Sequence, residues 1–389
     1  MIDFETALET MLSVTATSDS ESIPLEECVG RIVSEPVTAP LDLPPFSKSA
    51  MDGFAISSDD DSESYNIVET IAAGDVPANT ISEGVCARIM TGAMLPAGAD
   101  SVVRVENTEV VGETMSIVKP EGSANVIEAG ENVRSGDQIF SPGVVESRHI
   151  GIFAEQGIAE LVVQVSPLIG VITTGSELRD PGDPLPSGMI YNSNGPQLCA
   201  QITSMGGRYR YSGVVSDDPD QLEGRLAQEL EICEVVVLSG GVSMGEFDYV
   251  PRAVASVGAE IHFHKVSVKP GKPILYARLG EKQIVGLPGN PVSTYIIFEV
   301  MIKPMLYRMM GVEYAHDSIT GVLSTDIRRR DSERTEFRPV YVSSGRVEPA
   351  RYRGSSHLYA LGSANGLLRI ESGVTEIKEG VEVDVRPIQ

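Results

Sequence analysis

The chain has 389 residues and carries 55 Asp and Glu against 30 Lys and Arg, a formal net charge of −25 at pH 7. This charge argues against nucleic acid as a partner, since a phosphate backbone requires basic patches, and no apolar run approaches the roughly 18 residues of a membrane helix. The N-terminal segment is acidic and amphipathic, unlike a signal peptide. We therefore expect a cytoplasmic protein of about two to four domains, with no membrane partner.

Two further expectations come from composition. The acidic run SSDDDSES at 57–64 fits a protein kept soluble in high salt, where self-repulsion is screened, so we hypothesise a halophilic source. The four cysteines show no C-x-x-C spacing. We therefore expect buried free thiols and neither a zinc site nor disulfides.

In chain order, the pattern begins with a helix whose apolar positions are Ala7, Leu8, Met11 and Leu12. Short β-like runs separated by Gly, Pro and Asn follow up to about residue 143, which indicates a small β-rich unit. Further β-like runs beyond Gly311 indicate a terminal β domain.

Between residues 168 and 310, apolar runs alternate with helical stretches, which predicts a parallel sheet with helices on both faces. One helix can be placed in detail, because Asp218 suits the N-cap, Pro219 the first helical position, and Gln221 the capping box. Ligands of such sheets bind at the carboxyl ends of the strands. The segments 173–177, 216–218 and 239–243 should therefore converge there.

Three glycine-rich turns, SGGVS, KPGKP and GLPGNP, lie between residues 235 and 290. Glycines at strand ends let backbone N–H groups approach an anion, and a following helix adds its positive N-terminal end. Lys265, Lys269 and Lys272 fall in the same region, so we expect a site for a phosphorylated or oxyanionic ligand. The alternative is that these lysines only offset acidic neighbours.

Six blocks, in order along the chain, resemble the MoeA family, molybdopterin molybdenumtransferase, which is related to the E domain of gephyrin. They are PPFSKSAMDGFA, IMTGAMLP, TTGSEL, SGGVSMGEFDYV, KPGKP and GLPGNP. The resemblance implies a multidomain α/β and β fold and a homodimer. It implies a hinge and dimerisation domain (1–43 with 144–166), a β-rich domain (44–143), an α/β domain like that of MogA (167–311) and a C-terminal β domain (312–389).

The resemblance also implies the reaction. Members of the family insert molybdate into adenylylated molybdopterin and release AMP with the help of Mg²⁺, and tungstate is an oxyanion of similar size and charge. Four carboxylates match acidic positions of the family and are expected to be catalytic: Asp52, Glu177, Asp217 and Asp248. Glu177, Asp217 and Asp248 are the expected Mg²⁺ ligands. For Asp52 and Asp217, a role in a turn or cap is the alternative.

The same resemblance implies the substrate-binding residues. They are Thr91, Ser239, Gly240, Gly241, Ser243, Lys265, Lys269, Lys272, Pro288, Pro291, Arg338 and Ser356. Asn290 is expected to cap an apolar helix over 292–309.

The sequence departs from the family pattern at three positions. Ile127 and Asn132 stand where the family has arginine and aspartate, although Asp137 lies near enough to substitute for the latter, and Phe54 replaces the usual tyrosine. His262 and His264 form an H-x-H pair that has no third ligand in view, so we interpret it as structural.

Two other functions compete with the transferase. A molybdopterin adenylyltransferase would need only the central α/β domain, which leaves the matches at 44–55 and 89–96 unexplained. A non-catalytic scaffold like gephyrin would keep the fold while losing the acidic and basic side chains of the site. This chain retains Asp52, Glu177, Asp248 and the three lysines, which speaks against a scaffold.

Overall fold

The computed structural model describes residues 1–14, 19–242, 249–315, 318–351 and 354–388. These residues form two compact units. The larger unit comprises Met1–Ser34, Gly143–Glu146 and Glu160–Gln389, and the smaller unit comprises Glu35–Pro142 and Ser147–Ala159. The four-domain division expected from the sequence is finer than this and stays a prediction. None of the described helices combines the length and apolar character needed to cross a membrane.

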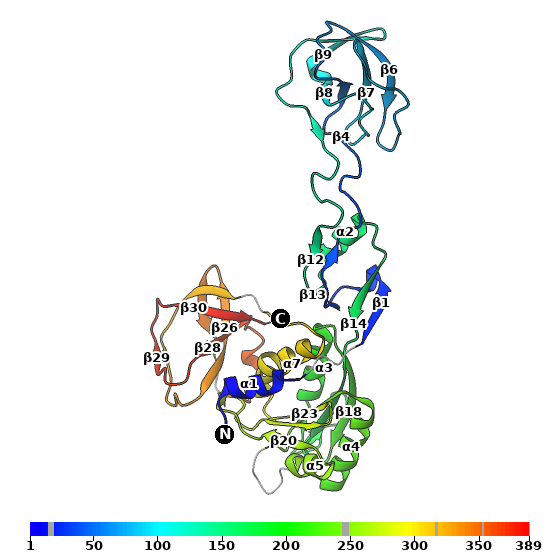
Figure 1. Cartoon of the computed structure of the whole chain (residues 1–389). Coiled ribbons are helices and arrows are strands. Elements are labelled where there is room, and N and C mark those ends of the chain that lie inside the picture. The colour runs from blue at the N-terminus through cyan, green and yellow to red at the C-terminus, as the bar shows by residue number, and fades with distance from the viewer. Residues whose placement is uncertain (15–18, 243–248, 316–317, 352–353, 389) are drawn as a thin grey trace. The chain divides into compact units, whose positions relative to one another are not determined.

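The larger unit is built around a six-stranded sheet (Figure 1). In spatial order its strands are β18 (Arg208–Val215), β15 (Leu168–Thr174), β19 (Val235–Ser239), β23 (Lys282–Leu287), β22 (Leu275–Leu279) and β20 (Glu260–Phe263). The first four are parallel, as predicted, but β22 and β20 are antiparallel to their neighbours. The short turn at Gly280 explains the reversed direction of β22, because a tight turn between β22 and β23 can join only antiparallel strands. β20 is antiparallel to β22 and therefore runs in the same direction as the first four strands.

Helices cover both faces of this sheet, which confirms the prediction. Successive residues of β19 point to opposite faces: Val235 and Val237 join one buried cluster, whereas Val236 and Leu238 join the other. The first cluster also holds residues of α1 (Phe4–Leu12), α3 (Asn194–Ser204), α6 (Pro291–Ile297) and α7 (Lys303–Met309). The second holds residues of α4 (Pro219–Ile232) and α5 (Val250–Ser256).

The N-cap predicted from the sequence is confirmed for α4 but not for α6. Asp218 caps α4 by accepting from the backbone N–H groups of Asp220 and Gln221, with Pro219 in the first turn, as predicted. Asn290 occupies the N-cap position of α6, but its side chain makes no capping hydrogen bond, so that prediction was wrong. The helix predicted over 292–309 contains a π-helical turn, Phe298–Ile302, just before Pro304, whose missing N–H interrupts the α-helical ladder.

A second sheet of the larger unit is formed mainly by the C-terminal segment. Its order is β21 (Val268–Lys269), β26 (Thr335–Ser343), β27 (Arg346–Pro349), β24 (Ile319–Leu323), β30 (Glu382–Pro387) and β28 (Gly366–Ile370), and β26 also pairs with β28. The same C-terminal segment also forms the short antiparallel pair of β25 (Ile327–Arg328) and β29 (Glu376–Ile377). Because β21 comes from the segment between β20 and β22, its parallel pairing with β26 joins the α/β part to the C-terminal part.

The smaller unit is β-rich, as predicted. Its six-stranded sheet has the order β8 (Ser101–Arg104), β5 (Gly53–Ile56), β7 (Val85–Ile89), β6 (Tyr65–Ile71), β10 (Thr114–Ile117) and β9 (Thr108–Val111). This unit also contains the pairs β4 (Lys48–Ser49) with β11 (Val126–Ile127) and β3 (Val37–Thr38) with β12 (Gln138–Phe140), and helix α2 (Ser147–Glu155).

Three short pairs complete the larger unit: β1 (Ser20–Pro24) with β14 (Glu160–Gln164), β2 (Ile32–Val33) with β13 (Gly143–Val144), and β16 (Leu178–Arg179) with β17 (Ile190–Tyr191). All four cysteines are free and buried, which confirms the expectation from their spacing.

Candidate active site

A pocket of about 590 Å³ lies at the carboxyl ends of β15, β18 and β19. The loops that follow these strands supply most of its wall, as expected for a parallel sheet. Predicted site residues that line it are Glu177, Asp217, Ser239, Gly240, Gly241, Pro291 and Ser356. The C-terminal segment thus reaches the pocket through Ser356, and the carbonyl of the preceding Ser355 accepts from the backbone N–H of Val292, 3.1 Å away.

Two loops of the pocket are tied together by a reciprocal pair of hydrogen bonds. The Ser176 backbone N–H donates to Asp217 Oδ2 at 3.0 Å, and the Asp217 backbone N–H donates to Ser176 Oγ at 3.1 Å. Glu177 follows directly, and its carboxylate folds back over Gly175, where an added Cβ would lie 2.9 Å from Glu177 Oε2. Glu177 and Asp217 therefore present their carboxylates to one pocket from adjacent strand ends.

The turn after β19 requires glycine. Gly240 and Gly241 have φ values of +101° and +60°, which residues with a side chain rarely adopt. A Cβ on Gly240 would also lie 2.4 Å from the carbonyl oxygen of Thr174. The turn thus packs directly on the end of β15, and the Thr174 hydroxyl beside it is buried without a hydrogen-bond partner among the described residues.

Two asparagines that the sequence analysis missed, Asn192 and Asn194, also line the pocket. Asn194 Nδ2 donates to Ser239 Oγ and to the Gly289 carbonyl, both at 2.8 Å. Asn192 Nδ2 donates to the hydroxyl of Tyr211 at 2.6 Å. Burial, and then a hydrogen bond to Asp180, raise the pKa of Tyr211 to about 12, so its hydroxyl stays protonated. The N-x-N sequence before α3 is the signal that could have pointed to them.

The polar groups around Ser239 form hydrogen bonds with one another. Ser239 is buried, and its hydroxyl accepts from Asn194 and lies 3.4 Å from the Pro288 carbonyl. That carbonyl also accepts from the hydroxyl of Thr294 at 2.8 Å. We infer that Ser239 and Pro288 support the pocket wall, while Pro291 lines the pocket from the first turn of α6.

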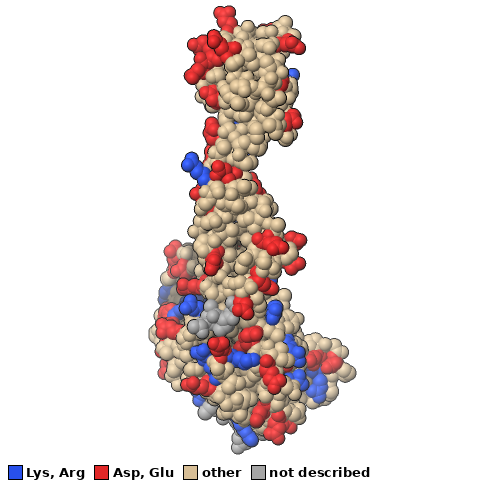
Figure 2. Space-filling model, turned by 45° about the vertical axis from the view of Figure 1, so that its right-hand side comes forward, with Lys and Arg blue, Asp and Glu red and all other residues tan. Residues whose placement is uncertain are grey.

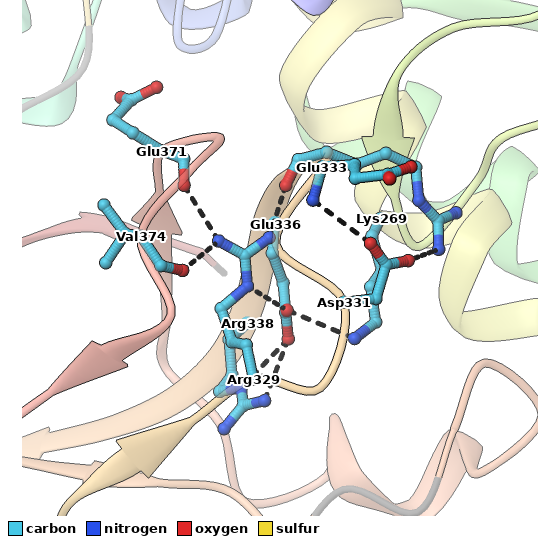
Figure 3. A network of polar contacts seen from close by, with 9 residues as sticks. Lys269, Arg329, Asp331, Glu333, Glu336, Arg338, Glu371 and Val374 are labelled. Atoms are coloured by element: carbon cyan, nitrogen blue, oxygen red, sulfur yellow. Dashed lines mark hydrogen bonds and ion pairs between the residues drawn. The ribbon is translucent and has the colours of Figure 1, made fainter.

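Lys269 and Arg338 meet at a different place in the larger unit, on the buried carboxylate of Glu336 (Figure 3). Lys269 Nζ lies 3.2 Å from Glu336 Oε2, and Arg338 donates to Oε1 through Nε at 3.1 Å and Nη2 at 2.9 Å. Arg329 completes the cluster at 3.0 Å from Oε2. Burial would raise the pKa of Glu336, but the charges of Arg338 and Lys269 outweigh it and hold the pKa below its usual value.

Within the part of the chain that the structure describes, the other two predicted lysines have no such partner. Lys265 is half-buried and Lys272 is exposed, and their backbone carbonyls accept from Ile2 and Val266. Neither lysine is among the described residues that line the pocket of Glu177 and Asp217.

Two predicted site residues, Asp52 and Thr91, belong to the smaller unit, where they contact each other. The backbone N–H and the hydroxyl of Thr91 both donate to Asp52 Oδ1 at 2.7 Å. Both hydrogen bonds lower the pKa of Asp52, and the one from the backbone N–H has the larger effect. In the same unit Ile127 pairs with Lys48, and Asp137 accepts from the backbone N–H of Arg134, so its carboxylate stabilises a turn.

Asp248 and Ser243 lie outside the described residues. Among the residues that are described, no three or more His, Cys, Asp or Glu gather into a metal site. The histidine pair fits this finding: His264 Nε2 lies 2.7 Å from the Val242 carbonyl, and His262 packs against Tyr276. A pocket with two carboxylates still suits Mg²⁺, which proteins commonly bind through one or two carboxylates plus substrate phosphates.

Models of known families match almost the whole chain. They are the MoeA N-terminal region (domain I and II) over residues 2–157, a probable molybdopterin binding domain over 170–308, and the MoeA C-terminal region (domain IV) over 320–388.

Individual proteins give the same result. The chain is 32% identical to the molybdopterin molybdenumtransferase of Staphylococcus aureus (strain COL), over 99% of this chain and 95% of that protein. It is 33% identical to the protein of that name from Staphylococcus epidermidis (strain ATCC 12228 / FDA PCI 1200), over 94% and 90%. The crystal structure of the molybdopterin biosynthesis MoeA protein from Pyrococcus horikosii superposes with a TM-score of 0.86 at 30% identity, covering 100% of this chain and 99% of that one. The chain belongs to the MoeA family of molybdopterin molybdenumtransferases.

Proposed function

We propose that this chain is a molybdopterin molybdenumtransferase that inserts molybdate into adenylylated molybdopterin and releases AMP. The observation that carries the proposal is the pocket at the strand ends, where Glu177 and Asp217 lie beside the Gly240–Gly241 turn. The family matches extend over almost the whole chain, and the C-terminal segment contributes Ser356 to the pocket.

Each part of the pocket has a chemical role in this proposal. Glu177 and Asp217 would hold Mg²⁺, together with Asp248, which lies outside the described residues. When bound, the cation neutralises charge on the phosphate oxygens next to the bond that breaks. The glycine turn lets the ligand approach the backbone closely, which a side chain at Gly240 would prevent.

The cluster around Glu336 supports a role for Lys269 and Arg338 in holding the anionic cargo. One carboxylate faces three cations there, so the cluster keeps a positive charge in a chain whose net charge is −25. Molybdate and tungstate are both tetrahedral dianions and would both fit. Lys265 and Lys272 would add to the field, and Arg338 offers a planar fork suited to oxyanions.

Four further expectations belong to the proposal. A homodimer is expected from the family, and Asp52 and Thr91 would then serve the reaction from the smaller unit. The halophilic source agrees with the acidic surface visible in Figure 2, and stability that rises with KCl concentration would support it. The cytoplasmic location and the absence of nucleic-acid and membrane partners stay predictions.

One assay separates the transferase from its alternatives. The protein is incubated with adenylylated molybdopterin and Mg²⁺, with and without molybdate, and AMP is followed. Release that depends on molybdate supports the transferase. A second reaction contains molybdopterin, ATP and Mg²⁺, and consumption of ATP in it would indicate the adenylyltransferase. Inertness in both reactions would indicate a scaffold.

A further inference from the structure

We propose that Glu336 is a positioning residue that holds Lys269 and Arg338 side by side as an oxyanion site. The proposal rests on the proposed function, because it concerns the residues that would hold the molybdate or tungstate. It adds a carboxylate to a site that was expected to consist of cations.

The geometry places Glu336 at the centre of the cluster. Only 1% of its side chain is exposed, against 32% for Lys269 and 20% for Arg338. Lys269 is aligned with Glu336 by the parallel pairing of β21 with β26, and Arg338 lies two residues further along β26, on the same face. The carboxylate therefore lies beneath two cations that remain accessible from outside.

Arg329 fixes the carboxylate from behind. It is 1% exposed, and its Nη1 donates to the carbonyls of Glu371 at 2.8 Å and Val374 at 2.9 Å while its Nη2 donates to the carbonyl of Arg334 (Figure 3). All three nitrogens of the Arg329 guanidinium thus donate hydrogen bonds to groups within the fold. Among the described residues, the side chains of Lys269 and Arg338 donate hydrogen bonds only to Glu336, and the Asp331 carboxylate interacts with Lys269 by charge alone. Each cation therefore keeps N–H groups for a ligand.

The physical reason for a carboxylate in an anion site is repulsion between the cations. Two neighbouring positive side chains would separate into solvent, where charges are well screened. A buried carboxylate between them offsets this repulsion and fixes both by hydrogen bonds to an ionised acceptor. The cluster still carries an excess of positive charge, so it can take a dianion.

In the test, the charge of Glu336 and its positioning role predict opposite changes in affinity for an anion. Glu336→Gln removes a negative charge next to the site, so charge alone predicts tighter binding of an anion. Positioning predicts the reverse, because the amide N–H₂ of Gln would face a cation and could not accept. We expect the Kd for molybdate alone, measured by calorimetry on the full chain, to rise about tenfold, the equivalent of one lost charge-assisted hydrogen bond.

Glu299→Gln is the matched control. Glu299 is also buried, pairs with Lys303 at 3.2 Å, and accepts from Gln201 at 2.8 Å, away from the cluster. It should lose stability without losing affinity for molybdate. Should Glu336→Gln fail to fold, Glu336→Asp keeps the charge but is one methylene shorter, and it should also weaken binding.

The results separate this inference from the proposed function. If the wild-type chain releases AMP in response to molybdate, and Glu336→Gln and Glu336→Asp bind molybdate as tightly as the wild type or more tightly, the positioning role is wrong and the transferase stands. If the wild-type chain shows neither binding nor AMP release, both are wrong. In a Lys269→Met background Glu336→Gln should weaken binding less than in the wild type, because Glu336 acts through Lys269.

Discussion

Asn194→Ala tests how the candidate pocket is held together. Asn194 is 8% exposed and joins Ser239 at the end of β19 to Gly289 in the loop before α6 through two hydrogen bonds of 2.8 Å. A net contribution of about 1 kcal/mol for each bond, with some loss of packing, predicts that the larger unit loses about 2 to 3 kcal/mol. Since both loops line the pocket, AMP should also bind more weakly.

The control is Asn365→Ala. The Asn365 side chain also makes two hydrogen bonds, both with the backbone of Val342, but it is exposed, so water can replace them. We expect it to cost less than about 1 kcal/mol. Urea unfolding followed by near-ultraviolet circular dichroism gives both values, and calorimetry gives the affinity for AMP. Equal destabilisation by the two variants, with unchanged AMP binding by Asn194→Ala, would refute the view that Asn194 fixes the pocket wall.

Three further predictions concern the fold around the site and the smaller unit. Thr174→Val should leave thermal stability unchanged or raised by up to about 1 kcal/mol, because its buried hydroxyl has no partner among the described residues; a clear loss would contradict this. Gly240→Ala should cost at least about 2 kcal/mol and more than Gly373→Ala, which has a similar positive φ but nothing within 4 Å of the added Cβ. Burial would raise the pKa of Glu121, but hydrogen bonds led by the Arg104 backbone N–H lower it to about 2, so the stability it adds is complete above about pH 4.5 and lost as the pH falls toward about 2. The protection factor of the Arg104 N–H, which corrects the exchange rate for its intrinsic pH dependence, should therefore fall over this range in the wild type, and an equal fall in Glu121→Gln would contradict the assignment.

The sequence was sufficient where a local pattern decides the structure. The alternation of apolar runs with helical stretches predicted the α/β sheet, and the Asp218-Pro219 start of α4 was correct because its hydrogen bonds form within a single turn. The convergence of the loops carrying Glu177 and Asp217 followed from the rule for parallel strand ends.

What depends on distant partners could not be predicted. The reversed strand β22 follows from a turn to β23 that has no Asn-Gly or Asp-Gly signal. The sequence pattern at the start of α3 does not reveal the hydrogen bonds of Asn194, because its partners Ser239 and Gly289 are distant in the chain. Glu336 was missed because a single glutamate in a strand has no pattern, and its three cations come from separate positions in the chain.

The central claim is that Glu177 and Asp217 serve the release of AMP in this pocket. The most direct measurement is the rate of molybdate-dependent AMP release by Asp217→Asn, whose amide oxygen can still accept from the Ser176 backbone N–H and so preserves the loop. We predict a fall of about 100-fold or more, since loss of residues that merely support metal ligands costs about 10- to 100-fold, and a need for more Mg²⁺. A folded variant with the wild-type rate at the wild-type Mg²⁺ concentration would contradict the claim.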